Sequence, residues 1–264
     1  MTERREPTVA IIGGSGVYES GLFAREDTHR VSTPWGAPSA PIEEGHVGGM
    51  RTLFLSRHAP GHTIPAHRVN YRANIDALKS LGADAIFAIN SVGSLREELP
   101  PGQFVLPTQF VDWTRNRPTT FFDGGRTYHV GMADPFCPVL VETARAVAQS
   151  RSFPVATGQT YVCIEGPRFS TRAESRLFRT FADVIGMTLV PECQLARERE
   201  MCYAAICMVT DYDVWAERPV DAEEVVRVLR ANVARVRDLL REAVPTVSPE
   251  RSCSCRNALE GAGL

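Results

Sequence analysis

Short apolar runs alternate with segments of helical periodicity along most of the chain. The apolar runs have the length of β-strands and occupy residues 8–12, 52–55, 85–89, 104–111, 160–164, 184–187 and 204–209. In the segments between them, apolar residues recur every three or four positions, which is the spacing of an amphipathic helix. This alternation of strands and helices predicts an α/β fold.

Three segments carry clear helix signals. Residues 68–81 have apolar side chains at helical spacing. Thr171 with Glu174 has the pattern of a capping box, and Asp221 with Glu224 has a looser form of it. The last of these boxes opens the longest helix that the pattern predicts. No repeat, low-complexity tract or Gly/Ser-rich linker divides the chain, so we predict a single domain over residues 1–245, followed by a tail at 246–264.

The composition is that of an ordinary globular protein, with 44% hydrophobic and 23% charged residues. A net charge of −2 gives no reason to expect nucleic acid or an anionic membrane as a partner. No segment reaches the roughly 18 apolar residues of a membrane span. Residues 1–7 lack the apolar core of a signal peptide. We therefore expect a cytoplasmic protein.

The chain has seven cysteines, which are expected to be thiols in a reducing compartment. Cys253 and Cys255 are separated by one residue, which is too close for a standard zinc knuckle. No set of Cys and His partners accompanies them along the sequence. The sequence therefore predicts no metal site.

Two carboxylates follow the apolar run at 204–209. Asp211 and Asp213 are two positions apart, so in an extended chain their side chains point the same way and could address one ligand. Carboxylates at a strand end suit proton transfer to a leaving group, or acceptance of hydrogen bonds from an amino group. An isolated Asp-x-Asp is more often an ordinary polar loop, so this pair gains weight only from its surroundings.

Hydrogen-bond donors follow the other predicted strands. The run Gly13-Gly14-Ser15-Gly16 could form an anion nest, although it lacks the Gly-Lys-Ser/Thr of a P-loop and the third glycine of a dinucleotide fingerprint. In an open α/β sheet, ligands gather beyond the carboxyl ends of the strands. The donors that would meet an anion there are Ser15, Arg57, His58, Asn90, Ser91 and Thr188.

The segment 165–170, Glu-Gly-Pro-Arg-Phe-Ser, predicts a stiff loop that carries an aromatic ring. Phe169 there is suited to stacking on a flat base, although a phenylalanine taken alone is more often a core residue.

Seven motifs taken together resemble one family. They are IIGGSG, SRHAPGHTIPAHRVNYRANI, VGSLREEL, MADPFCP, YVCIEGPRFSTRAES, IGMTLVPE and VTDYDVW, in matching order and spacing from about residue 9 to 240. The sequence resembles the 5′-methylthioadenosine phosphorylases, which belong to the trimer-forming class of purine nucleoside phosphorylases. The resemblance implies a single α/β domain with a central mixed sheet, distorted towards a barrel and flanked by helices. It also implies a homo-oligomer, a trimer or a dimer of trimers, whose subunits share their active sites.

The resemblance further implies residue roles. Phosphate would be held by Ser15, Arg57, His58, Ser91 and Thr188, while Asn90 departs from the small hydroxyl residue of some members. The nucleoside would meet Phe169, Ser170 and Met187, with Asp211 facing purine N7 and Asp213 the 6-amino group. The 5′-methylthio group would meet His129, Val225 and Val228, together with an apolar residue from a neighbouring subunit's tail. The tail with Cys253 and Cys255 is similar to that of thermophilic members, some of which carry intracellular disulfides.

The implied reaction is phosphorolysis, in which methylthioadenosine and phosphate give adenine and 5-methylthioribose 1-phosphate. Phosphate beside C1′ is both the nucleophile and the charge that stabilises the cationic sugar, while a proton on N7 neutralises the leaving purine. Asp211 can supply that proton only if its pKa is raised by burial or by a neighbouring carboxylate. Phosphate is a co-substrate, and no metal or organic cofactor is expected.

Four alternatives remain open from the sequence. A broad-range purine nucleoside phosphorylase and a methylthioinosine phosphorylase would use most of the same residues. Two aspartates favour a 6-amino purine, since a carboxylate accepts a hydrogen bond from N6 and opposes an O6 acceptor. A silent nucleoside-binding protein would not need Asp211. A nucleosidase that uses water would not need the anion site of Arg57 and His58.

Overall fold

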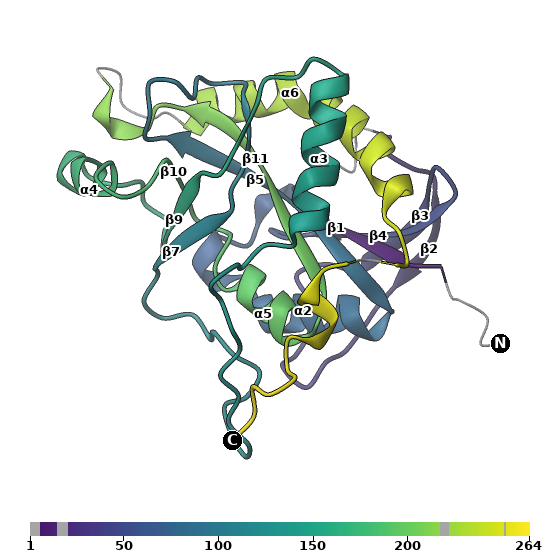
Figure 1. The fold of residues 1–264 in the computed structure, drawn as a ribbon. Helices are drawn as coiled ribbons and strands as arrows, with labels where there is room; N and C mark the ends of the chain where they lie inside the picture. The colour runs from purple at the N-terminus through teal and green to yellow at the C-terminus, as the bar shows by residue number, and fades with distance from the viewer. Residues whose placement is uncertain (1–5, 15–20, 217–221, 251) are drawn as a thin grey trace.

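The computed structural model describes residues 6–14, 21–216, 222–250 and 252–264. It is built around one mixed sheet with helices packed against it (Figure 1). The strands are β1 (Thr8–Gly13), β2 (Arg25–His29), β3 (Ile42–Val47), β4 (Met50–Ser56), β5 (Ala83–Ser94), β6 (Phe104–Leu106), β7 (Gln109–Trp113), β8 (Val155–Thr157), β9 (Thr160–Ile164), β10 (Val184–Gly186) and β11 (Cys202–Asp211). The helices are α2 (Tyr71–Ser80), α3 (Pro138–Ser150), α4 (Arg172–Phe178), α5 (Glu192–Glu198) and α6 (Ala222–Ala243). Short 3-10 turns lie at Pro60–His62, Ala66–Arg68, Asp213–Trp215, Val244–Thr246 and Ser254–Asn257.

Strand β5 is the centre of the sheet, because it pairs with three other strands. One edge pairs in parallel with β11, from Ala85 to Gly93. The other edge pairs in parallel with β1 as far as Ala88, and then antiparallel with β10 at Gly93 and Ser94. The sheet therefore branches, and the edge of β5 between residues 88 and 93 has no strand beside it among the described residues. A ligand can approach the sheet at such a branch, as it does at the switch points of open α/β sheets.

Two pairs of helices cover the central strands (Figure 1). Helices α3 and α6 pack on each other and on β11, while α2 and α5 pack on each other, α2 against β5 and α5 against β11. Strand β11 is buried from Cys202 to Thr210, which explains its nearly continuous apolar sequence. The predicted α/β fold, with a mixed sheet flanked by helices, is confirmed.

Local signals placed several elements correctly. The predicted strand at 160–164 is β9 with the same bounds. The capping box at the start of α4 is present, because the Thr171 side chain accepts a hydrogen bond from the Glu174 N–H and the Glu174 carboxylate accepts one from the Thr171 N–H. The looser box at Asp221 lies outside the described residues.

Two predicted strand boundaries were wrong. Residues 104–111 form two strands, because Pro107 has no N–H to continue a ladder and the halves pair with different partners, β6 with β11 and β7 with β9. The strand predicted at 85–89 continues to Ser94, since it stays paired with β11 as far as Gly93 and its last two residues also pair with β10. Asn90 and Ser91 therefore lie inside β5 and do not follow its end.

Candidate active site

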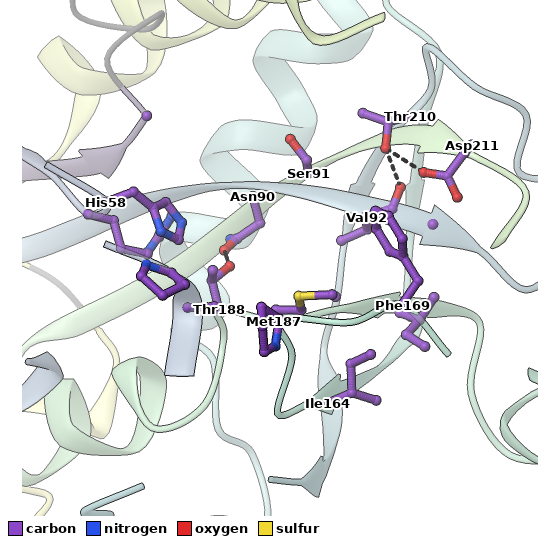
Figure 2. Close-up of a pocket in the computed structure, with 18 of the residues that line it drawn as sticks. His58, Asn90, Ser91, Val92, Ile164, Phe169, Met187, Thr188, Thr210 and Asp211 are labelled. Atoms are coloured by element: carbon purple, nitrogen blue, oxygen red, sulfur yellow. Dashed lines mark hydrogen bonds between the residues drawn. The ribbon is translucent and has the colours of Figure 1, made fainter. Parts of the chain in front are cut away.

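A pocket of about 510 Å³ opens at the unpaired stretch of the β5 edge. This size is within the range of small-molecule sites. Its wall is built by the middle of β5, by residues after β4 and β10, by the end of β11 and by the loop before α4. Figure 2 shows His58, Asn90 and Thr188 at one end and Asp211 with Phe169 at the other, with Met187 between them. We call these the anion end and the carboxylate end.

Arg57 lies at the anion end and is almost completely buried. Its Nε and Nη2 donate to the two Glu192 oxygens at 2.7 Å each, and its Nη1 donates to the Ile89 carbonyl at 2.9 Å. Burial alone would lower the pKa of Arg57, but the charge and hydrogen bonds of Glu192 outweigh burial and raise it. These bonds occupy three of the five guanidinium N–H groups, so two remain that can meet an anion.

His58 lines the same end and is a neutral imidazole at pH 7. Burial, with the positive charge of Arg57, lowers the pKa of His58 to about 4. Its Nδ1 lies 2.9 Å from the Ile64 carbonyl oxygen, which can only accept, so Nδ1 carries the proton. The other nitrogen, Nε2, is then an acceptor. The ring of His62 stacks on His58, with 4.2 Å between ring centroids.

Asn90 and Thr188 form one hydrogen-bonded unit on the pocket wall. The Thr188 hydroxyl donates to Asn90 Oδ1 at 2.7 Å (Figure 2). Asn90 Nδ2 donates to the Ala88 carbonyl at 3.1 Å. Asn90 thus orients Thr188, and one of its N–H groups remains for a ligand. Ser91 also lines the pocket. Ser15 lies outside the described residues, although the neighbouring Gly14 is part of the lining.

Asp211 and Asp213 both face the carboxylate end, but not for the reason that the sequence suggested. Asp213 has a φ of 50° and begins a 3-10 turn, so the pair is not extended. The turn brings the Asp213 N–H to Asp211 Oδ1 at 2.8 Å, and the Thr210 hydroxyl donates to Asp211 Oδ2 at 2.8 Å (Figure 2). Both carboxylates are therefore held at the pocket through the turn itself.

The pKa of Asp211 is raised above its ordinary value. Burial is the main cause and the nearby Asp213 carboxylate adds to it, while the hydrogen bonds from Thr210 and from the Asp213 N–H act in the opposite direction. A raised pKa makes the protonated acid more available near neutral pH. Asp213 is 4% exposed, and its two oxygens accept the Ser170 hydroxyl at 2.8 and 3.0 Å.

An aromatic ring and a thioether line the pocket near the carboxylates. Phe169 is 42% exposed, so it is a pocket residue and not the core residue that a lone phenylalanine suggests. Met187 lines the wall between the two ends (Figure 2). Phe169, Ser170 and Met187 are thus brought together as the sequence predicted.

The residues assigned to a 5′-methylthio group are not brought into the pocket of this chain. Neither His129 nor Val228 belongs to its lining, and the side chain of Val225 lies outside what the structure describes. Val233, one turn and a half further along α6 than Val228, does line it. His129 is exposed, and its N–H donates to the Ala262 carbonyl of the tail at 2.8 Å.

Three functional supports were missed by the sequence reasoning. Glu192 fixes Arg57, and Thr210 fixes Asp211. Glu192 lies in the motif IGMTLVPE and Thr210 in the motif VTDYDVW, so the motifs could have indicated both residues. Arg117 is buried and donates to the carbonyls of Met187 and Glu165, at 2.8 and 2.7 Å, so it ties together the two loops that carry Met187 and Phe169. No motif marks Arg117.

Comparisons with known proteins show the family of this chain. The family model described as the phosphorylase superfamily matches residues 8–245. An S-methyl-5′-thioadenosine phosphorylase from Pyrococcus furiosus is 54% identical over 254 residues, covering 96% of this chain and 98% of the relative. One from Nitrosopumilus maritimus is 51% identical and covers 98% of each chain. A methylthioadenosine phosphorylase structure from an antarctic soil metagenomic library has a TM-score of 0.92 at 39% identity, covering 98% of this chain and 93% of that one.

A further comparison concerns a bound nucleoside. A variant of adenosine/methylthioadenosine phosphorylase from Schistosoma mansoni, in complex with methylthioadenosine, has a TM-score of 0.91 at 38% identity and covers 97% of each chain. The fold and the pocket, together with these matches, define a member of the phosphorylase superfamily. Within that superfamily, the chain belongs to the S-methyl-5′-thioadenosine phosphorylases.

Proposed function

We propose that this protein cleaves S-methyl-5′-thioadenosine by phosphorolysis, giving adenine and 5-methylthioribose 1-phosphate. The observation that carries the proposal is a single pocket with a buried guanidinium, Arg57, at one end and a carboxylic acid of raised pKa, Asp211, at the other. Phosphorolysis of a nucleoside breaks the bond between C1′ of the sugar and the base. It needs an anionic nucleophile on the sugar side of this bond and a proton donor on the base side. The pocket supplies a group for each.

Phosphate binds at the anion end. The two remaining N–H groups of Arg57 and one N–H of Asn90 donate to its oxygens. The acceptor Nε2 of neutral His58 takes a hydrogen bond from a protonated phosphate oxygen. Because these groups are buried and held by other bonds, they need little reorganisation when phosphate attacks C1′ and the sugar becomes cationic.

Adenine leaves at the carboxylate end, where Asp211 donates a proton to N7. Each Asp211 oxygen already accepts one hydrogen bond, so the carboxyl group keeps its orientation in both protonation states. The raised pKa of Asp211 reduces the free energy needed to protonate it at neutral pH. Phe169 stacks on the purine, and Met187 packs against the ribose.

Asp213 selects the base. Its carboxylate is held by the Ser170 hydroxyl and can accept a hydrogen bond from the adenine 6-amino group. The 6-oxo group of hypoxanthine or guanine would place an acceptor against this acceptor. A 6-amino purine is therefore the preferred base.

The 5′ end of the pocket is completed by a second copy of the chain. His129 is exposed and lies on a segment paired with the tail, through a bridge from Tyr128 to Gly263 and a hydrogen bond from the Leu264 N–H to the Thr127 carbonyl. Leu264 is 83% exposed, so its side chain is available to pack against another copy of the chain. In a trimer or a dimer of trimers, this paired segment supplies His129 and an apolar side chain to a neighbour's methylthio group.

The experiment that tests the proposal compares four nucleosides at a fixed phosphate concentration: methylthioadenosine, adenosine, inosine and methylthioinosine. The highest kcat/KM is expected for methylthioadenosine, and no added metal or organic cofactor should be needed. A higher kcat/KM for inosine than for methylthioadenosine would instead identify a broad-range purine nucleoside phosphorylase.

For the part of the chain that the structure describes, no helix is both long and apolar enough to cross a membrane.

A further inference from the structure

Four cysteines from three separate segments lie together at the N-terminal end of α3. Cys137 directly precedes α3, Cys202 begins β11, and Cys253 and Cys255 belong to the tail. Their four sulfur atoms all lie within 4.8 Å of one another, and those of Cys202 and Cys253 are 3.4 Å apart. No Cys/His ligand set was expected for the tail cysteines from the sequence, but the structure places Cys137 and Cys202 of the domain beside them.

The arrangement of these sulfurs is that of a tetrahedral ligand set. Four thiolates about 2.3 Å from a central zinc ion stand about 3.8 Å from one another. The sulfurs of the cluster are at most 4.8 Å apart, and rotation of the side chains can close the remaining difference of about 1 Å. We propose that Cys137, Cys202, Cys253 and Cys255 bind one Zn²⁺ ion in a structural site, separate from the catalytic pocket.

The surroundings of the cluster favour thiolates. Cys137 is the N-cap of the 13-residue helix α3, where the positive end of the helix dipole stabilises a negative sulfur. Arg197 places a guanidinium nitrogen 3.9 Å from the Cys255 sulfur, so it partly balances the charge of a tetrathiolate site. Three of the four side chains are buried and Cys253 is half-buried.

The site also has an entry path and a structural consequence. A cleft of about 480 Å³ is lined by Cys255 and Arg197, so an ion can reach the cluster from solvent. Zinc bound by two body cysteines and two tail cysteines would fasten the tail to the domain. That tail holds the segment of His129 through the Ala262 carbonyl, so the ion would also fix the segment proposed to reach a neighbouring subunit.

The competing fate of these thiols is oxidation to disulfides. A disulfide joins sulfurs in pairs at about 2.05 Å. Here the Cys202 and Cys253 sulfurs are 3.4 Å apart, and the four sulfurs of the cluster are gathered in one group rather than in two separate pairs. This arrangement favours a shared ligand.

The test is metal titration of the full-length, fully reduced protein. One Co²⁺ or Zn²⁺ per chain should bind, Co²⁺ should give the absorption of a tetrahedral thiolate site, and Tm should rise on binding. Cys253→Ser and Cys255→Ser should each weaken binding by more than about a hundredfold, because each removes a ligand. Cys193→Ser is the matched control, since Cys193 is buried nearby with its sulfur 3.5 Å from the Pro135 carbonyl, outside the cluster.

A second measurement does not depend on folded variants. In wild-type protein with zinc, the four cluster cysteines should resist alkylation, and a chelator should make all four reactive, as mass spectrometry of peptides can map. The proposal is overturned if reduced wild-type protein binds no Co²⁺, or if protein isolated under alkylating conditions carries the four residues as disulfides and no metal. It is also overturned if Cys193→Ser loses the ion as completely as Cys255→Ser.

Discussion

Replacing Asp213 with asparagine tests how the pocket recognises its base. Asp213 is 4% exposed and accepts the Ser170 hydroxyl with both oxygens. Asn keeps the shape of the side chain and one acceptor for Ser170, but it puts an N–H₂ group where the other carboxylate oxygen was. Against adenine that group meets another donor. Against hypoxanthine it meets O6, which accepts.

The expected magnitude follows from the burial of this group. A buried polar group left without a partner costs about 1–3 kcal/mol. The ratio of kcat/KM for methylthioadenosine to that for methylthioinosine should therefore fall by about ten- to a hundredfold in Asp213→Asn. The position is too buried for water to replace the lost bond easily.

The assay is steady-state kinetics on both nucleosides at saturating phosphate, with purified wild type and variant. Asp211→Asn is the control, because removing the ionisable acid should lower kcat for both nucleosides and leave their ratio nearly unchanged. If Asp213→Asn leaves the ratio within about twofold of wild type, base selection does not depend on Asp213 and the reasoning is refuted.

Three further predictions use other parts of the structure. Gly93→Ala should lower kcat by about tenfold or more with little change in Tm, because the added methyl group would meet Asp211 Oδ1 at 2.9 Å and displace it; an unchanged kcat would contradict this. Glu192→Gln should lower the unfolding free energy by about 3–5 kcal/mol in denaturant titrations, since it leaves the buried guanidinium of Arg57 without a compensating negative charge. The exposed Glu142→Gln should cause no measurable change. The unfolding free energy should fall by up to about 3 kcal/mol as pH drops from about 6.5 to 4, because the unfolded chain binds a proton at His58 more tightly than the folded chain does. His58→Gln should reduce this pH dependence. Identical profiles of unfolding free energy against pH for wild type and His58→Gln would contradict a lowered pKa of His58.

Sequence patterns located the features that depend on neighbouring residues. The apolar runs placed β9 and the core of β11, and the Thr171 capping box placed the start of α4. Each of these signals reflects hydrogen bonds or burial within a few residues of the chain. The motifs likewise singled out Arg57, Thr188 and the two aspartates, and the structure places all four in the lining of one pocket.

Features set by distant contacts could not be read in this way. The extension of β5 past Ile89 depends on its pairing with β11 and, at its last two residues, with β10, both about 90 residues or more away in sequence. Arg57 and Glu192 are 135 positions apart, and nothing in either local sequence indicates their ion pair. The four-cysteine cluster joins residues from Cys137 to Cys255 for the same reason. The positive φ of Asp213 also had no signal, because aspartate is compatible with both an extended strand and a turn.

Phosphate dependence is the most direct test of the proposed reaction. Release of adenine from methylthioadenosine should stop when phosphate is removed from purified wild-type protein and return on its addition, with 5-methylthioribose 1-phosphate formed in equal amount. Arg57→Ala should raise the KM for phosphate, since Arg57 lies at the anion end, and should also lower the unfolding free energy, since it leaves Glu192 buried without its partner. Undiminished adenine release in phosphate-free buffer, with free methylthioribose as the product, would mean that water is the nucleophile and would contradict the account.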